Sequence, residues 1–228
     1  MRPTVLLFDI DGTLISTGGA GRRAISRAFD LLHRREDACA TFSFDGMTDR
    51  AIVRLGLAAI GVDATDANID ALLATYITCL EASVRSVPDQ HYVVHDGMRD
   101  AVDASLRAGA AVGLGTGNVR EGARVKLQRV GLYSKFSFGG FGDDHELRPE
   151  LIRAGADRGA RQLDVKREDA RVVIIGDTPK DVHAALAIGA ECIGVSTGAH
   201  GVDELRDVGA KWAFNSLAEE GALKALLG

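Results

Sequence analysis

Two aspartates separated by one residue lie near the start of the chain, in the run Asp9-Ile10-Asp11-Gly12. Carboxylates this close repel each other unless a positive group neutralises them. A hard divalent cation with oxygen ligands is the natural partner of such a pair. Glycine at position 12 allows the chain to turn sharply behind it. The pattern indicates a metal-dependent reaction centre, with a solvated turn in which Asp11 caps a helix as the structural alternative.

A second pair of acids occurs far along the chain, in Gly176-Asp177-Thr178-Pro179-Lys180-Asp181. Thr178, Pro179 and Asp181 fit a capping box at the start of a helix, so Asp181 also has a structural interpretation. The two interpretations are compatible, because a capping acid can also hold the water of a metal ion or a basic side chain.

A hydroxyl and an amide side chain flank a glycine in Thr116-Gly117-Asn118. A hydroxyl followed by backbone amides at the start of a helix forms a site of phosphate size. The alternative is that Thr116 or Asn118 only caps a helix expected over about 119–130. The surrounding run GLGTGN lacks the third glycine of the dinucleotide fingerprint, which disfavours a dinucleotide-binding oxidoreductase.

Short apolar runs precede these polar residues and predict buried parallel strands. The four runs are 4–9, 111–116, 172–177 and 192–196. Helical patterns alternate with them, so we predict an α/β fold with a doubly wound, Rossmann-like parallel sheet and right-handed crossovers. Ligands bind at the carboxyl ends of the strands in such sheets. The three polar groups should therefore meet at one edge.

About a hundred residues separate the first two strands, far more than a crossover needs. Two apolar faces at helical spacing occupy this interval: Ala24, Ile25, Ala28, Phe29 and Leu32, then Ile69, Leu72, Leu73, Tyr76, Ile77 and Leu80. We therefore predict a catalytic core of residues 1–15 and 96–228 and an all-helical insert of residues 16–95 that covers the end of the sheet.

Composition narrows the partners and the compartment. The chain has 32 acids against 27 bases, which disfavours a nucleic-acid partner. No apolar stretch is long enough to span a bilayer, and the amino terminus is a poor secretory signal. Three widely spaced cysteines without a CxxC motif favour a reducing compartment, so we expect a cytoplasmic protein without a membrane partner. The sequence does not indicate an oligomeric state.

Taken together, the polar groups resemble the motifs of the haloacid dehalogenase-like hydrolase superfamily. FDIDGTL is similar to its first motif, LGTGN to its second and IIGDTPKD to its fourth. The resemblance covers essentially the whole chain, because the helical insert resembles the cap of phosphoglycolate phosphatase-like members. It implies a Mg²⁺-dependent phosphatase that acts on a small phosphorylated molecule.

The resemblance also implies catalytic roles for individual residues. Asp9 would be the nucleophile that becomes an aspartyl phosphate. Asp11 would protonate the leaving oxygen and later deprotonate water. Thr116 would bind phosphoryl oxygens together with the amides of Gly117 and Asn118.

The metal ligands follow from the same resemblance. Asp9, the Asp11 carbonyl and Asp177 would hold Mg²⁺, and Asp181 would lie behind them. We therefore expect the four aspartates to converge around a single ion, which screens the repulsion between a carboxylate and a phosphate.

The third motif departs from the family pattern, which has a lysine shortly before the fourth motif. Here the matching stretch is Glu146-Leu147-Arg148-Pro149, so an arginine stands in that place. Lys126 is a rival, and the catalytic cation is left open between the two. The structural alternatives are a helix-dipole partner for Lys126 and a surface ion pair for Arg148.

Substrate identity should depend on the insert. Arg22, Arg23 or Arg50 could bind a substrate carboxylate or second phosphate, or could simply be solvated. Asp11 argues against a dehalogenase, and the absence of lysine from residues 16–95 argues against a phosphonate hydrolase that forms a Schiff base. A β-phosphoglucomutase-like sugar phosphomutase and a non-catalytic binding or regulatory module stay as alternatives.

Overall fold

The computed structural model describes residues 2–228 and has the order of elements expected of an α/β chain. The strands are β1 (Thr4–Phe8), β2 (Ile15–Ser16), β3 (Val93–Val94), β4 (Ala111–Gly115), β5 (Gly139–Gly140), β6 (Arg171–Gly176), β7 (Glu191–Val195) and β8 (Trp212–Phe214). The helices are α1 (Ala20–His33), α2 (Asp49–Ala59), α3 (Asp66–Ser86), α4 (Met98–Arg107), α5 (Arg120–Arg129), α6 (Arg148–Gln162), α7 (Pro179–Ala187), α8 (Val202–Asp207) and α9 (Ala222–Leu227).

A parallel sheet with the order β5-β4-β1-β6-β7-β8 forms the centre of the molecule. The four predicted strands are confirmed to within about a residue at each end. β5 and β8 extend the two edges and escaped prediction, because two or three residues are too few to show a periodic pattern. The strand β1 lies between β4 and β6, so Asp9 and Asp177 emerge side by side.

Alternate residues of β1 pack into two separate apolar clusters. Leu6 and Phe8 belong to a cluster that includes residues of α4, α5 and α9. Val5 and Leu7 belong to the other, which includes residues of α6, α7 and α8. All four side chains are fully buried. Helices therefore cover both faces of the sheet, which confirms the doubly wound arrangement and explains why the strand is apolar throughout.

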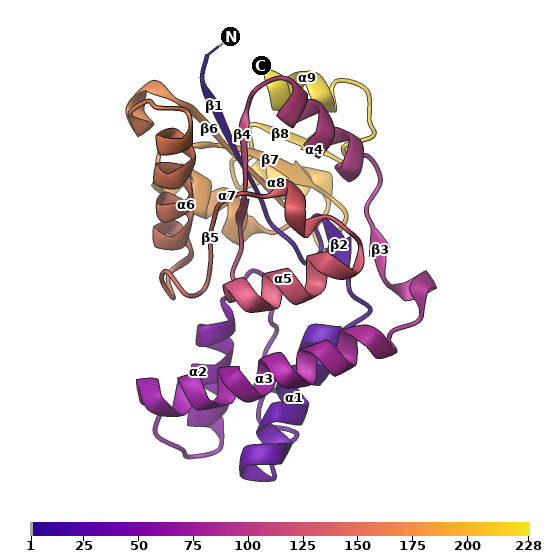
Figure 1. The fold of residues 1–228 in the computed structure, drawn as a ribbon, viewed down its shortest axis with the longest axis vertical. Helices are drawn as coiled ribbons and strands as arrows, with labels where there is room; N and C mark the ends of the chain where they lie inside the picture. The colour runs from indigo at the N-terminus through magenta and orange to yellow at the C-terminus, as the bar shows by residue number, and fades with distance from the viewer. Residues whose placement is uncertain (1) are drawn as a thin grey trace.

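The helices α1, α2 and α3 lie beyond the carboxyl ends of the strands, opposite to the two chain termini (Figure 1). The chain passes between them and the sheet along β2 and β3, which pair antiparallel. We keep the division into residues 1–15 with 96–228 and residues 16–95 as a proposal that agrees with this placement.

One residue of the predicted apolar face of α1 is placed differently from the prediction. Ala24, Ile25, Ala28 and Phe29 are buried, whereas 46% of the Leu32 surface is exposed. The last turn of α1 is incompletely covered, because the helix ends at His33 and the chain turns away through Arg34 in the left-handed conformation.

Two further observations concern the whole described chain. Within residues 2–228, no helix combines the length and apolar character needed to cross a membrane. The cysteines Cys39, Cys79 and Cys192 are all free thiols.

Candidate active site

A cavity of about 290 Å³ lies between the carboxyl edge of the sheet and the helices α1–α3. The polar residues that follow β1, β4 and β6 all line it, as the sequence predicts for parallel strand ends. Its lining includes Asp9, Asp11, Thr116, Gly117, Asn118, Lys126, Arg148 and Asp177 from the sheet side, and Gly21, Arg22, Asp49 and Tyr76 from the other side.

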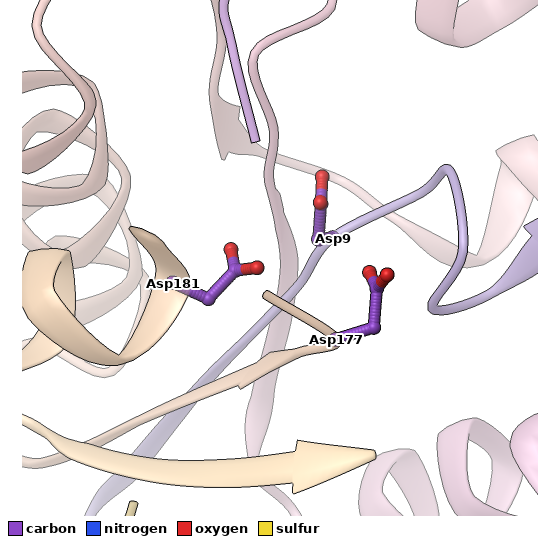
Figure 2. A group of neighbouring side chains, drawn as sticks. All are labelled: Asp9, Asp177 and Asp181. Atoms are coloured by element: carbon purple, nitrogen blue, oxygen red, sulfur yellow. The ribbon is translucent and has the colours of Figure 1, made fainter. Parts of the chain in front are cut away.

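Three buried carboxylates form a compact group at the base of this cavity. One oxygen from each of Asp9, Asp177 and Asp181 lies within 4.8 Å of the others (Figure 2). Asp9 follows β1, where its amide donates to the Ile175 carbonyl at 2.9 Å, and Asp177 follows β6. Asp181 lies in the first turn of α7, where the predicted capping box with Thr178 is confirmed. The same residue thus serves the helix start and the acidic group.

Arg148 is the cation in contact with this group. Its Nη2 lies 2.8 Å from Asp9 Oδ2 and 2.5 Å from Asp181 Oδ1, and its Nε donates to Asp181 Oδ1 at 3.0 Å. Arg148 belongs to the first turn of α6, and its side chain is 7% exposed. The alternative of a surface ion pair is therefore wrong.

One guanidinium leaves three neighbouring carboxylates with an excess of negative charge. Burial raises the pKa of Asp9 to about 6, although Arg148 opposes the shift. Burial, followed by the charges of Asp181 and Asp9, raises the pKa of Asp177 to about 8. An all-oxygen donor set with surplus negative charge fits a hard divalent cation such as Mg²⁺.

Close packing around Asp177 positions its carboxylate. Thr13 Oγ1 donates to Asp177 Oδ1 at 2.7 Å. A Cβ atom at Gly12 would lie 2.3 Å from Asp177 Oδ2, and one at Gly198 would lie 1.9 Å from it. Glycine is required at both positions, because any side chain would displace the carboxylate.

The Asp11 side chain lies apart from the three-acid group. Its Oδ2 accepts hydrogen bonds from Lys126 Nζ at 2.6 Å and from Asn118 Nδ2 at 2.8 Å. The expectation that four aspartyl side chains converge is therefore wrong for Asp11, because Lys126 and Asn118 hold its carboxylate apart from the other three. Nor does Asp11 cap a helix, since α1 begins only at Ala20.

Lys126 and Arg148 both reach the cavity but contact different acids. Lys126 Nζ donates to Asp11 Oδ2 and to Asn118 Oδ1, each at 2.6 Å, and its side chain is 5% exposed. Of the two cations, Arg148 contacts Asp9. The cation of the third-motif position thus lies beside the predicted nucleophile, and Lys126 lies beside the predicted acid and base.

The residues after β4 form a closed hydrogen-bonded turn. Thr116 Oγ1 accepts from the Asn118 amide at 3.3 Å and from Asn118 Nδ2 at 2.9 Å. Neither residue caps α5, whose N-cap is Val119 without a side-chain cap. The alternative in which Thr116 or Asn118 only caps this helix is therefore wrong. An acid from elsewhere in the chain bonds to the start of α5 instead.

Asp49, at the start of α2, supplies this acid. Asp49 Oδ2 accepts a hydrogen bond from the Val119 amide at 2.9 Å, and the Asp49 amide donates to the Gly117 carbonyl at 2.8 Å. Asp49 is 6% exposed, and burial raises its pKa to about 6. The sequence did not reveal this acid, because its partner lies about 70 residues further along the chain.

Of the three arginines predicted to bind substrate, Arg22 lines the cavity. Its guanidinium donates to the carbonyls of Cys39 at 3.3 Å and Phe42 at 3.4 Å. It also lies 3.8 Å from the centre of the Phe44 ring. Arg22 is thus held by the loop that precedes α2.

The structure does not bring Arg23 or Arg50 into the cavity lining. Arg23 donates to the Gly18 carbonyl at 2.6 Å, and Arg50 pairs with Asp66 and Asp70 on α3. Their assignment to substrate is unsupported, because neither side chain lines the cavity and both contact neighbouring groups of the insert.

Residues 6–186 match the family model described as haloacid dehalogenase-like hydrolase. The chain is 26% identical to "Probable phosphatase IndB" of Dickeya dadantii (strain 3937), over 100% of this chain and 96% of that protein. It is 25% identical to "Phosphoglycolate phosphatase" of Pseudomonas putida, over 86% of this chain and 70% of that protein.

Solved structures share the fold over nearly the whole chain. The crystal structure of CbbY from Rhodobacter sphaeroides in complex with phosphate has a TM-score of 0.72 at 21% identity, over 98% of this chain and 100% of that chain. A predicted phosphatase from Clostridium acetobutylicum has a TM-score of 0.71 at 22% identity, over 99% of both chains. At these identities the likeness concerns the fold alone.

Proposed function

The chain belongs to the haloacid dehalogenase-like hydrolase family, and from that premise we propose that it is a Mg²⁺-dependent phosphatase acting on small-molecule phosphomonoesters through an aspartyl phosphate on Asp9. One observation carries the proposal. The Asp9 carboxylate is buried beside Arg148 at the wall of a cavity that Asp11, Thr116 and Asn118 also line. A nucleophile, a proton donor and a phosphate-sized loop thus share one space.

Asp9, Asp177 and the Asp11 carbonyl would hold the Mg²⁺ ion, and Asp181 would support the site through its contact with Arg148. The bound ion would neutralise charge between the nucleophile and the phosphate. Arg148 favours the ionised, nucleophilic form of Asp9, because its positive charge opposes the effect of burial on the pKa of that carboxyl.

Two displacements at phosphorus complete the reaction. In the first, an Asp9 oxygen forms a bond to phosphorus while the bond to the leaving alcohol breaks, and the Asp11 carboxyl passes its proton to the leaving oxygen. In the second, Asp11 takes a proton from water, whose oxygen bonds to phosphorus as the bond to Asp9 breaks. Lys126 and Asn118 hold the Asp11 carboxylate in place.

The loop after β4 would bind the phosphoryl oxygens in both displacements. The Thr116 hydroxyl and the amides of Gly117 and Asn118 are the proposed donors. Gly117 packs tightly, since a Cβ atom there would lie 2.2 Å from the Met47 carbonyl oxygen. Positioning and charge neutralisation supply most of the catalysis in phosphoryl transfer, so a rigid donor loop suits this reaction.

Phosphate release from p-nitrophenyl phosphate and from 2-phosphoglycolate, with Mg²⁺ and with EDTA, tests the proposal. We expect activity that requires Mg²⁺ and a phosphorylated protein species, detected by intact-protein mass spectrometry after rapid acid quench. The relatives named as phosphoglycolate phosphatases justify the second substrate. Full activity in EDTA would overturn the metal dependence. A coupled assay for isomerised sugar phosphate distinguishes a phosphatase from the phosphomutase alternative. A cytoplasmic location stays a prediction.

A further inference from the structure

The helix α5 lacks the local acid that caps α7. In a capping box, the side chain three residues inside a helix accepts a hydrogen bond from the amide of the N-cap residue. In α7 that side chain is Asp181, which accepts from the Thr178 amide at 3.1 Å. The corresponding position of α5 is Gly122, which has no side chain to do this. The N-cap amide of α5 therefore takes its acceptor from elsewhere in the chain.

Asp49 of α2 is that acceptor. The amide of Val119, the N-cap of α5, donates to Asp49 Oδ2 at 2.9 Å. A Cβ atom at Gly122 would lie 3.6 Å from the same oxygen, so the carboxylate lies beside the position where a local capping side chain would begin. The Asp49 amide also donates to the Gly117 carbonyl at 2.8 Å. One buried residue of the insert thus bonds to the chain on both sides of Asn118.

These bonds fix the turn 116–118, which we propose to bind phosphoryl oxygens. The turn is packed tightly, since a Cβ atom at Gly117 would lie 2.2 Å from the Met47 carbonyl oxygen. The Gly142 amide holds it from the core by donating to the Asn118 carbonyl at 2.9 Å. Backbone amides bind an anion when they point at it together, so the orientation of neighbouring peptide groups matters. Asp49 can therefore affect phosphate binding without touching the phosphate.

Other contacts hold the insert against the core independently of the Asp49 side chain. Lys180 Nζ donates to the Asp45 carbonyl at 2.7 Å, and Arg54 pairs with Glu146 at 2.9 Å. A change of the Asp49 side chain leaves these contacts in place. Such a change therefore tests the bond to α5 rather than the docking of the insert as a whole.

We propose that Asp49 is a positioning residue that caps α5 from the insert and thereby orients the amides of Gly117 and Asn118 for phosphate binding. The effect on phosphate rests on the proposed phosphatase function, whereas the effect on the backbone of α5 does not. The acceptor oxygen carries this role. Asparagine supplies such an oxygen without the charge, and alanine supplies none.

Hydrogen–deuterium exchange of the ligand-free protein tests the backbone contact. We expect residues 116–123 to exchange about fivefold faster in Asp49→Ala, because the Val119 amide loses its acceptor, and within about twofold of the wild-type rate in Asp49→Asn. Thr65→Ala is the matched control. Thr65 caps α3 on the same insert by accepting from the Asn68 amide at 3.2 Å, and it does not line the cavity. Its loss should leave the exchange of residues 116–123 unchanged.

Inorganic phosphate, used as a competitive inhibitor of p-nitrophenyl phosphate hydrolysis with Mg²⁺, tests the effect on binding. The inhibition constant should rise about fivefold in Asp49→Ala, and kcat/KM should fall by a similar factor. Asp49→Asn should bind phosphate at least as tightly as the wild type, because it keeps the acceptor and removes a negative charge from the cavity. Thr65→Ala should match the wild type.

Four results would overturn the assignment. Equal weakening of phosphate binding in Asp49→Ala and Asp49→Asn would attribute the effect to charge. A fall of kcat in Asp49→Asn with unchanged exchange and inhibition would give the carboxylate a direct part in the reaction. Unchanged inhibition in Asp49→Ala would show that the turn does not depend on this residue. Faster exchange throughout the insert would indicate general unfolding.

The wild type separates failure of this inference from failure of the proposed function. A wild type that hydrolyses neither p-nitrophenyl phosphate nor 2-phosphoglycolate overturns the phosphatase and, with it, the role of Asp49 in phosphate binding. An active wild type with any of the four contrary results overturns this inference alone.

Discussion

The two sides of the cavity differ in how completely their polar groups are paired. On the sheet side, Arg148 bonds to Asp181 and contacts Asp9, and Thr13 bonds to Asp177. On the insert side, the Asp49 side chain accepts one hydrogen bond, from the Val119 amide. Groups that bond to one another are held in place for a reaction common to many substrates, whereas a carboxylate with spare acceptor capacity can also bind a ligand.

The two sides are joined through the loop after β4. Asp49 donates its amide to the Gly117 carbonyl and accepts from the Val119 amide. Arg54 of α2 also pairs with Glu146, 2.9 Å apart, just before α6. Asp49 on the insert side therefore positions the proposed phosphate loop, and the comparison between the two sides can be sharpened by changing one side at a time.

The largest effect is expected at the proposed nucleophile. Asp9→Asn keeps the shape of the side chain but removes the attacking carboxylate, so kcat should fall by about a thousandfold or more. The measurements are the rate of phosphate release and the amount of phosphorylated protein, and both should fall. Asp103→Asn changes a half-buried surface acid that pairs with Lys135, and it serves as the control. Activity that survives Asp9→Asn would remove the nucleophile assignment.

The two cations should differ in their importance. Arg148→Ala leaves three buried carboxylates without the guanidinium that contacts Asp9, so kcat should fall about a hundredfold. Lys126→Ala should cost about tenfold, because it frees Asp11 but leaves the metal site intact. Turnover and thermal unfolding of both variants provide the comparison. A larger loss for Lys126→Ala would reverse the assignment of the catalytic cation.

Crowding of Asp177 should weaken the metal site specifically. Gly198→Ala places a methyl group 1.9 Å from Asp177 Oδ2, so the carboxylate must move. We expect the Mg²⁺ concentration for half-maximal activity to rise about tenfold or more. Gly201→Ala is the matched control, since no atom lies within 4 Å of its Cβ position. An unchanged Mg²⁺ requirement would show that Asp177 is not a ligand.

The smallest effect concerns stability on the insert side. Burial raises the pKa of Asp49 from 3.8 to about 6, so ionisation opposes folding, and the wild type should lose stability as the pH rises through this interval. Asp49→Asn cannot ionise. Its free energy of unfolding relative to that of the wild type, measured by denaturant titration at each pH, should therefore increase up to about pH 6 and then level off, by at most about 3 kcal/mol. A difference that is constant with pH would contradict the burial of the charge.

The fold was largely predictable from apolar runs, because buried parallel strands need uninterrupted hydrophobic residues. Four strands, the doubly wound order and the capping box of Thr178 and Asp181 were confirmed. The short edge strands β5 and β8 and the exposure of Leu32 escaped prediction, since these depend on neighbours remote in the chain. The site was predictable where residues follow strands directly, as Asp9, Thr116 and Asp177 do.

Amino-acid types and local spacing thus specify which chemical groups stand at the carboxyl ends of the strands, because strand direction and burial are encoded over five or six residues. Local spacing does not predict which acid each cation contacts. Arg148 pairs with Asp181 across 33 positions, Lys126 with Asp11 across 115 and Asp49 with Val119 across 70. Contacts over such separations form only when packed helices and sheet bring distant segments together, so tertiary structure alone distinguishes the side of the cavity that holds the nucleophile from the side that meets the leaving group.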